Sequence, residues 1–148
     1  MNELVIALGW SGVFGVLSLS AIGSIIGCST AGQAAIGAML ETQSGFGRYI
    51  GVSAMPSSQV IFGIVIMFVL NREMTPSYAA GAFGIGIFAG LALLYSGIKQ
   101  GQCCASAINA SKEKPEIFGM SLAPAALVEG FATFVFIFAL VLAGSLPS

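Results

Sequence analysis

Four long apolar segments, separated by three short polar turns, account for nearly the whole chain. The segments cover residues 4–40, 49–70, 78–111 and 117–146, and the turns cover residues 41–48, 71–77 and 112–116. Each segment is long enough, as a helix, to cross a bilayer hydrocarbon core of about 30 Å. Helices are expected because a backbone in lipid must satisfy its own hydrogen bonds. The sequence therefore predicts an all-α membrane protein with four transmembrane helices.

The composition limits what such a chain does. Of its 148 residues, 57% are hydrophobic and 7% are charged, whereas soluble domains have about 25% charged residues. Histidine is absent, so the chain has no imidazole metal site and no histidine proton relay. The N-terminal stretch lacks a basic region and a small-residue cleavage pattern, and we expect it to begin a retained helix. The three cysteines lie in apolar segments, where thiols pack as hydrophobes, and we expect neither a disulfide nor zinc at Cys28, Cys103 and Cys104.

The two halves of the chain resemble each other. GSIIGCSTAGQAAIGA in the first segment aligns with GIKQGQCCASAINASK in the third, and FGIVIMFVL in the second aligns with FVFIFALVL in the fourth. In this alignment Ser57 falls opposite Glu129. The sequence therefore predicts a duplicated helical hairpin that kept one carboxylate, with hairpins at 1–70 and 78–148 joined by a turn at 71–77.

Glycines are concentrated in alternate segments. The first and third segments hold thirteen glycines, several of them in GxxxG pairs that let helix backbones approach closely. The fourth segment instead carries a cluster of four phenylalanines between residues 131 and 138. Small inner helices and bulky outer ones suit a ring with a tight inner wall. The glycines are Gly9, Gly12, Gly15, Gly23, Gly27, Gly32, Gly37, Gly81, Gly84, Gly86, Gly90, Gly97 and Gly101, and the phenylalanines are Phe131, Phe134, Phe136 and Phe138.

Glu129 is the only acidic residue between Ile117 and Leu146. It has apolar helix on both sides and is therefore expected near the middle of the bilayer. An ionisable group there costs roughly 2.5–3.5 kcal/mol on insertion scales, which makes it a candidate functional residue. The plain alternative is a protonated carboxyl group that only hydrogen-bonds a neighbouring helix.

Other polar side chains are expected at the depth of Glu129. Counted from the turns, Ser58 and Gln59 of the second segment and Gln100 of the third lie near that level. Their oxygens are hard ligands that suit an alkali cation rather than a soft metal. A proton needs only the carboxyl group and one acceptor, so the surplus of oxygens favours sodium. The alternative is that these side chains simply hydrogen-bond the helices together.

Three motifs at this level identify a family resemblance. The PSSQ motif at 56–59, the SGIKQG motif at 96–101 and the ALVEG motif at 126–130, carried on two tandem hairpins, resemble the proteolipid of V-type and archaeal-type rotary ATPases. This proteolipid, often called K or c, forms the rotor ring. The resemblance implies a homo-oligomeric ring that works with a stator membrane subunit, which provides half-channels, with central-stalk subunits and with lipids.

The resemblance also implies a ligand set. In sodium-pumping bacterial members of the family, the ion is held by a backbone carbonyl, a hydroxyl, two glutamines and a glutamate. In this sequence those roles fall on the Met55 carbonyl, Ser58, Gln59, Gln100 and Glu129. The implied cargo is Na⁺, with H⁺ as the alternative.

Four further positions bear on the site. Pro56 and Pro124 shortly precede Ser58 and Glu129, and proline is expected to kink these helices. Sodium-type members have a tyrosine one turn beyond the second-helix glutamine, where this chain has Phe62. Lys99 adjoins Gln100 but is expected to point about 100° away around the helix, toward the ring lumen or headgroups. A pairing of Lys99 with Glu129 would instead compete with the cation.

Basic residues predict the orientation. Arg48, Lys112 and Lys114 lie in the first and third turns, whereas the middle turn holds only Arg72. By the positive-inside rule, the turns 41–48 and 112–116 face the cytoplasm, and both termini lie on the opposite side of a bacterial or archaeal plasma membrane.

The leading functional hypothesis is a rotor component that carries one Na⁺ or H⁺ per copy at Glu129, coupled to ATP hydrolysis or synthesis elsewhere in the complex. We expect no catalytic residues on this chain, no nucleic-acid partner and no phosphate-binding loop of the GxxxxGK[ST] type. One alternative is a small proton-coupled tetraspan carrier that works as a dimer. The other is a structural or pore-forming tetraspan without coupling, in which Glu129 is dispensable.

Overall fold

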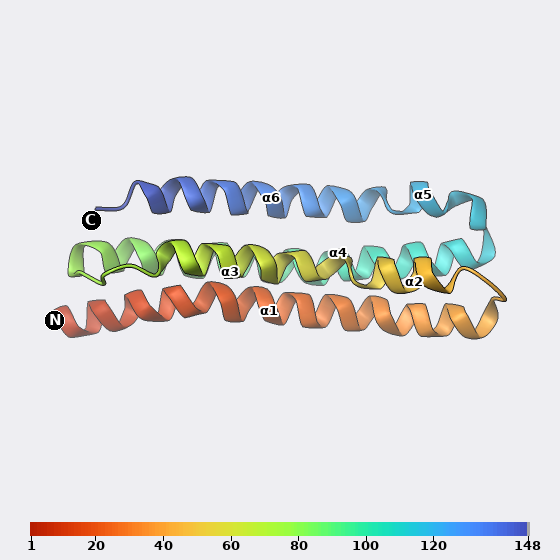
Figure 1. Cartoon of the computed structure of the whole chain (residues 1–148), viewed down its shortest axis with the longest axis horizontal. Coiled ribbons are helices and arrows are strands. Elements are labelled where there is room, and N and C mark those ends of the chain that lie inside the picture. The colour runs from red at the N-terminus through yellow and green to blue at the C-terminus, as the bar shows by residue number, and fades with distance from the viewer. Residues whose placement is uncertain (148) are drawn as a thin grey trace.

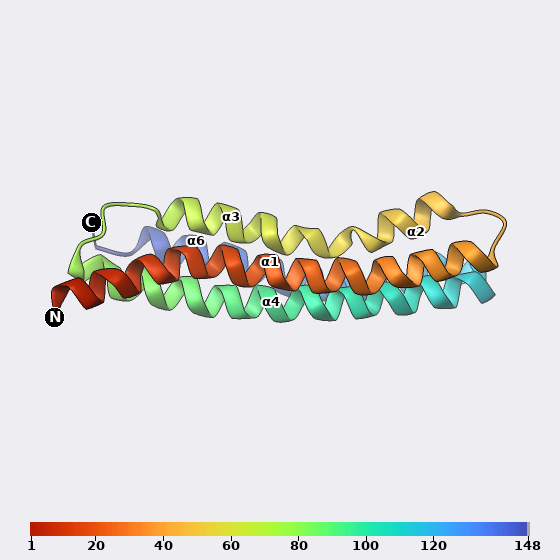
Figure 2. The same ribbon diagram turned by 90° about the horizontal axis from the view of Figure 1, so that it is seen from below.

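The chain forms a bundle of four long antiparallel rods (Figures 1 and 2) in this computed structural model, which describes residues 1–147. Within these residues, four helical stretches are long and apolar enough to cross a membrane: Asn2–Glu41, Phe46–Leu70, Pro76–Glu113 and Pro115–Gly144. The prediction of an all-α membrane protein with four transmembrane helices is confirmed. The elements are α1 (Asn2–Glu41), α2 (Phe46–Ser53), the 3₁₀ turn η1 (Met55–Ser57), α3 (Ser58–Leu70), α4 (Pro76–Glu113), the 3₁₀ turn η2 (Pro115–Ile117), α5 (Phe118–Ser121) and α6 (Ala123–Gly144).

Two helices begin earlier than predicted because local capping residues start them. Gly45 has φ of 86°, a left-handed conformation that glycine adopts without strain, and α2 begins directly after it. The last three residues of the predicted turn 41–48 are therefore helical. The Thr75 hydroxyl accepts a hydrogen bond from the Tyr78 backbone N–H at 3.3 Å, and Pro76 takes the first helical position of α4.

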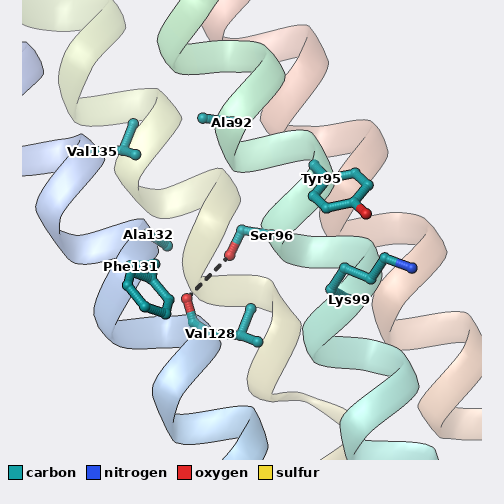
Figure 3. A pocket seen from close by; sticks show the side chains of 8 residues that line it. All are labelled: Ala92, Tyr95, Ser96, Lys99, Val128, Phe131, Ala132 and Val135. Carbon is teal, nitrogen blue, oxygen red and sulfur yellow. Dashed lines mark hydrogen bonds between the residues drawn. The ribbon is translucent and has the colours of Figure 1, made fainter.

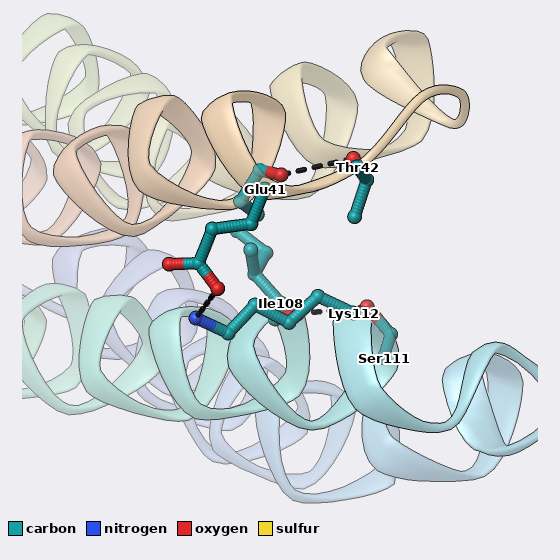
Figure 4. Close-up of polar contacts among 6 residues, drawn as sticks. Glu41, Thr42, Ile108, Ser111 and Lys112 are labelled. Carbon is teal, nitrogen blue, oxygen red and sulfur yellow. Dashed lines mark hydrogen bonds and ion pairs between the residues drawn. The ribbon is translucent and has the colours of Figure 1, made fainter.

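The third turn is shorter still. The last residues of α4 and the first of η2 take up most of the predicted turn 112–116, and only Lys114 lies between them. An ion pair of 2.7 Å between Lys112 Nζ and Glu41 Oε2 joins α4 to α1 at this end (Figure 4). Because Glu41 is largely exposed, the pair is expected to contribute little to stability.

Helices α1 and α4 lie side by side along their length and form the closest contact in the bundle (Figure 2). A Cβ atom added at Gly97 would lie 2.6 Å from the Gly23 carbonyl carbon, and one added at Gly23 would lie 2.7 Å from the Leu94 Cα. Only glycine fits at such an approach. Three of the predicted contact glycines, in contrast, face open space within this chain, so they have no packing role inside it: Gly32, Gly37 and Gly84.

The second and fourth rods are interrupted, as the prolines predicted. Ala54 separates α2 from η1, where Pro56 removes a backbone donor and the chain tightens into a 3₁₀ turn. Gly27 of α1 makes room for this proline, because a Cβ there would lie 2.7 Å from Pro56 Cβ. Leu122 separates α5 from α6, two residues before Pro124. Both breaks lie in the rods that carry the candidate site.

Helix α6 presents a bulky apolar face. Phe131, Phe134 and Phe138 of α6 are exposed within this chain, whereas Phe136 points inward. Phe136 stacks on Phe62 with ring centroids 4.8 Å apart.

The two ends of the bundle differ in what they carry. Both chain termini and the connection at 71–75 lie at one end, and the connections at 42–45 and 114 lie at the other (Figure 1). The guanidinium of Arg48 lies at this second end, 5.2 Å from the Tyr49 ring centroid and 5.1 Å from that of Phe118. This cation–π contact links the two hairpins.

Candidate ion-binding site

Three rods bring four of the predicted site residues together. Glu129 lies on α6, Gln100 on α4, and Ser58 and Gln59 at the start of α3, just after the break at η1. Glu129 Oε2 accepts hydrogen bonds from Ser58 Oγ at 2.7 Å, Gln100 Nε2 at 2.6 Å and Gln59 Nε2 at 3.4 Å. The four polar groups that the sequence placed at one depth therefore form a single cluster.

The environment of Glu129 suits an ionised carboxylate. Gln59 and Gln100 are fully buried, and Glu129 itself is partly buried. Hydrogen bonds to a charged group contribute roughly 1.5–3 kcal/mol each. Within residues 1–147 the ion pair between Lys112 and Glu41 is the only one, so no basic side chain of the described chain neutralises Glu129. A carboxylate at this depth needs a cation or a proton from outside the chain.

Four oxygen atoms gather at the Ser58 hydroxyl, its own included. Ser58 Oγ lies 2.7 Å from Glu129 Oε2, 3.2 Å from the Met55 carbonyl oxygen and 3.3 Å from Gln59 Oε1. A hydroxyl has one hydrogen to donate, and the shortest contact, to Glu129, takes it. The other two contacts are close approaches between oxygen atoms, of the kind that a hard cation stabilises.

The 3₁₀ turn brings the Met55 carbonyl into this group. The Ser58 backbone N–H donates to it at the end of η1, so the carbonyl points along the rod toward the serine. The kink at Pro56 alone would free the carbonyl of Val52 instead. The geometry therefore puts an oxygen of Met55 beside the cluster, although its role as a ligand stays a prediction.

The two glutamine amides are linked to each other. Gln59 Nε2 donates to Gln100 Oε1 at 2.9 Å, and Gln100 Nε2 donates to Glu129 and, at 3.4 Å, to the Ala125 carbonyl. In this arrangement Gln59 has its oxygen toward Ser58, whereas Gln100 presents its NH₂ group to the carboxylate. Gln100 must turn its amide to offer an oxygen to a cation.

Two serines missing from the sequence prediction support the site. Ser96 of α4 accepts a bond from Gln59 Nε2 at 3.4 Å and donates to the Val128 carbonyl at 3.4 Å. Ser24 of α1 accepts a bond from the Val60 backbone N–H at 3.0 Å and so anchors the start of α3. The available signal for Ser96 was its spacing, four residues before Gln100 on the same helix face.

The remaining predicted residues lie around the cluster. Phe62 packs on Phe136 through its ring and has no hydroxyl to offer Glu129. Pro56 is buried against α1, and Pro124 is exposed at the start of α6. The supporting roles of these residues stay predictions.

Lys99 turns away from Glu129. Its Nζ donates to Gln102 Oε1 at 3.2 Å and lies 5.3 Å from the Tyr95 ring centroid. Lys99 and Tyr95 line an apolar groove of about 320 Å³ between α4 and α6, together with Ser96 and Phe131 (Figure 3). In this structure Lys99 does not compete with a cation at the carboxylate, in line with the direction predicted from helix geometry.

Comparison with known proteins decides the family. The family model for the C subunit of ATP synthase matches the chain twice, over residues 11–70 and 83–142, with one match in each hairpin. The chain belongs to the ATP synthase C-subunit family. This membership confirms the predicted resemblance to rotary ATPase proteolipids, which are membrane proteins without catalytic residues, and the double match confirms the predicted duplication.

Two curated relatives are similar to the chain. The A-type ATP synthase subunit K of Methanocaldococcus jannaschii is 36% identical over 137 residues, which make up 86% of this chain and 58% of the relative. The chain therefore spans a little under three fifths of that relative's length. The V-type sodium ATPase subunit K of Enterococcus hirae is 28% identical over 152 residues, which make up 96% of this chain and 97% of the relative.

Proposed function

We propose that the chain is a rotor-ring subunit of a V-type or A-type rotary ATPase and carries one Na⁺ per copy at Glu129. The observation that supports this proposal most is the set of three hydrogen bonds that the Glu129 carboxylate accepts from α3 and α4. Glu129 lies inside the candidate membrane span Pro115–Gly144. Within residues 1–147 no basic side chain pairs with it. A mobile cation is the partner that such a group lacks.

Sodium is preferred over the proton because of the number of oxygens. A proton needs one acceptor, whereas oxygens of Met55, Gln59 and Glu129 each lie within 3.3 Å of Ser58 Oγ. The similarity to a V-type sodium ATPase subunit K supports the same ion. Phe62 removes one hydroxyl from the site, which leaves Ser58 and the two glutamines as the donors and ligands around the carboxylate.

The proposed cycle follows from charge. A bound Na⁺ neutralises the charge of Glu129. The free energy of exposing the site to lipid as the ring turns is then far lower than for an ionised carboxylate without a cation. At a stator half-channel the cation exchanges with water, and a stator arginine takes its place beside Glu129. Copies of the chain form the ring, and rotation is transmitted through central-stalk subunits. The connections at 42–45 and 114 then face the cytoplasm and dock this stalk.

The proposed function is tested with Glu129→Gln, which keeps the shape of the side chain and removes its charge. We expect ion transport by the assembled complex to be lost while the ring still forms in detergent. Glu73→Gln, in the connection between α3 and α4 at the opposite end of the bundle, is the matched control and should transport normally. Normal transport by Glu129→Gln would exclude the rotor assignment, and loss of transport in the control would show that the assay reports general damage.

A further inference from the structure

Ser96 forms hydrogen bonds that differ from those of most helical serines in this chain. Ser20 and Ser106, for example, donate back to carbonyls of their own helix, at 3.0 Å in each case. Ser96 instead donates across the bundle to the Val128 carbonyl of α6 at 3.4 Å (Figure 3). It is buried, and its oxygen also accepts from Gln59 Nε2 at 3.4 Å. This hydroxyl therefore links α4, α6 and the Gln59 side chain.

The direction of these bonds is fixed by chemistry. A backbone carbonyl only accepts hydrogen bonds, so the single hydrogen of the Ser96 hydroxyl points to Val128. Only lone pairs of Ser96 remain for Gln59, and an amide can donate only through its nitrogen. Gln59 Nε2 must therefore face Ser96. Its oxygen then lies on the other side of the amide, 3.3 Å from Ser58 Oγ.

We propose that Ser96 is a positioning residue that sets which way the Gln59 amide faces, so that Gln59 Oε1 joins the oxygens offered to the cation. Ser96 does not touch the ion and acts through Gln59. The inference rests on the proposed function for its effect on sodium, although the orientation of the amide stands on the hydrogen bonds alone. A reversed amide would bring an NH₂ group to the cation and withdraw one oxygen ligand.

The effect of removing Ser96 on sodium binding is limited, because Ser96 is one of several acceptors for the Gln59 NH₂ group. Gln59 Nε2 also donates to Gln100 Oε1 at 2.9 Å and to Glu129 Oε2 at 3.4 Å, so removing Ser96 weakens the preference for one orientation without abolishing it. One neutral hydrogen bond is worth about a threefold to tenfold change in an equilibrium. Ser96→Ala should raise the sodium concentration for half-protection of Glu129 from carbodiimide labelling by that factor.

The first experiment measures this protection in the intact ring. Ser96→Thr keeps a hydroxyl and should restore half-protection to the native value, whereas Ser96→Ala should not. In a Gln59→Leu background, adding Ser96→Ala should change nothing further, because the residue through which Ser96 acts is gone. An unchanged half-protection in Ser96→Ala, or the same shift with and without Gln59, would refute the proposal.

The second experiment does not depend on sodium. The chain has five glutamines, so the side-chain amide signals of a ring labelled with ¹⁵N-glutamine are assigned by single substitutions. In sodium-free protein, Ser96→Ala should shift the Gln59 NH₂ signals and Ser96→Thr should leave them near their native positions. Unmoved Gln59 signals in Ser96→Ala would refute the proposal. A native ring without sodium protection would refute the sodium assignment, while the amide signals would still decide the role of Ser96.

Discussion

Gln100→Leu isolates the strongest single contact to Glu129. Gln100 Nε2 donates to Glu129 Oε2 at 2.6 Å, the shortest of the three bonds to that oxygen. A hydrogen bond to a charged group contributes roughly 1.5–3 kcal/mol, which corresponds to about a tenfold to 150-fold change in an equilibrium constant. Leucine retains most of the volume of the side chain but removes both its donor and its oxygen.

The assay is sodium protection of Glu129 against a hydrophobic carbodiimide, which reacts with the protonated acid. Bound sodium keeps Glu129 ionised and slows labelling. For Gln100→Leu we expect half-protection at about tenfold to 150-fold higher sodium, with labelling in the absence of sodium retained because proton binding needs only the carboxyl group and one acceptor.

Gln102→Leu is the matched control for this prediction. It makes the same substitution two residues further along α4, where the residue is exposed and the amide oxygen accepts a hydrogen bond from Lys99 Nζ at 3.2 Å. Its half-protection should equal that of the native ring. If Gln100→Leu also kept the native value, Gln100 would contribute nothing to the ionised state of Glu129, and the reasoning from the 2.6 Å contact would be wrong.

Three other predictions concern the scaffold. Gly97→Ala should lower the temperature at which the ring dissociates, by overpacking worth about 1–3 kcal/mol, because its Cβ meets α1 at 2.6 Å; Gly119→Ala, which meets nothing within 4 Å, should not. A cysteine at Thr42 should react with an impermeant thiol reagent only from the cytoplasmic side and one at Glu73 only from the other, and the reverse pattern would overturn the orientation. Lys112→Ala should change stability by less than about 1 kcal/mol, because its partner is 60% exposed; thermal unfolding of the ring measures this, and a larger loss would show that the pair is not a weak surface contact.

Much of the fold was predictable because membrane helices leave a strong signal in the sequence. Long apolar segments with few charges are expected to be helical in lipid. Glu129 stood out as the only acidic residue of the fourth segment. The similar depth of Ser58, Gln59 and Gln100, counted from the turns, correctly predicted that they lie beside Glu129.

Other features depended on contacts that depth does not determine. A serine in a helix usually bonds its own backbone, so apart from its spacing of four residues from Gln100 nothing in the sequence separated Ser96 from Ser106. The inward turn of Phe136 depends on rotation about the axis of α6 and on a partner ring at Phe62. The early start of α2 depends on the left-handed conformation of Gly45, and the turn has a second glycine, Gly47, that could adopt it as readily.

The most direct test of the account is the amount of ²²Na⁺ bound by the purified ring at saturating sodium. The account predicts one Na⁺ per chain in the native ring, because one carboxylate with its surrounding oxygens is present in each copy. It predicts no specific binding in a ring assembled from Glu129→Gln. A native ring that binds no sodium, or a Glu129→Gln ring that binds as much as the native one, would contradict the claim that Glu129 carries the ion.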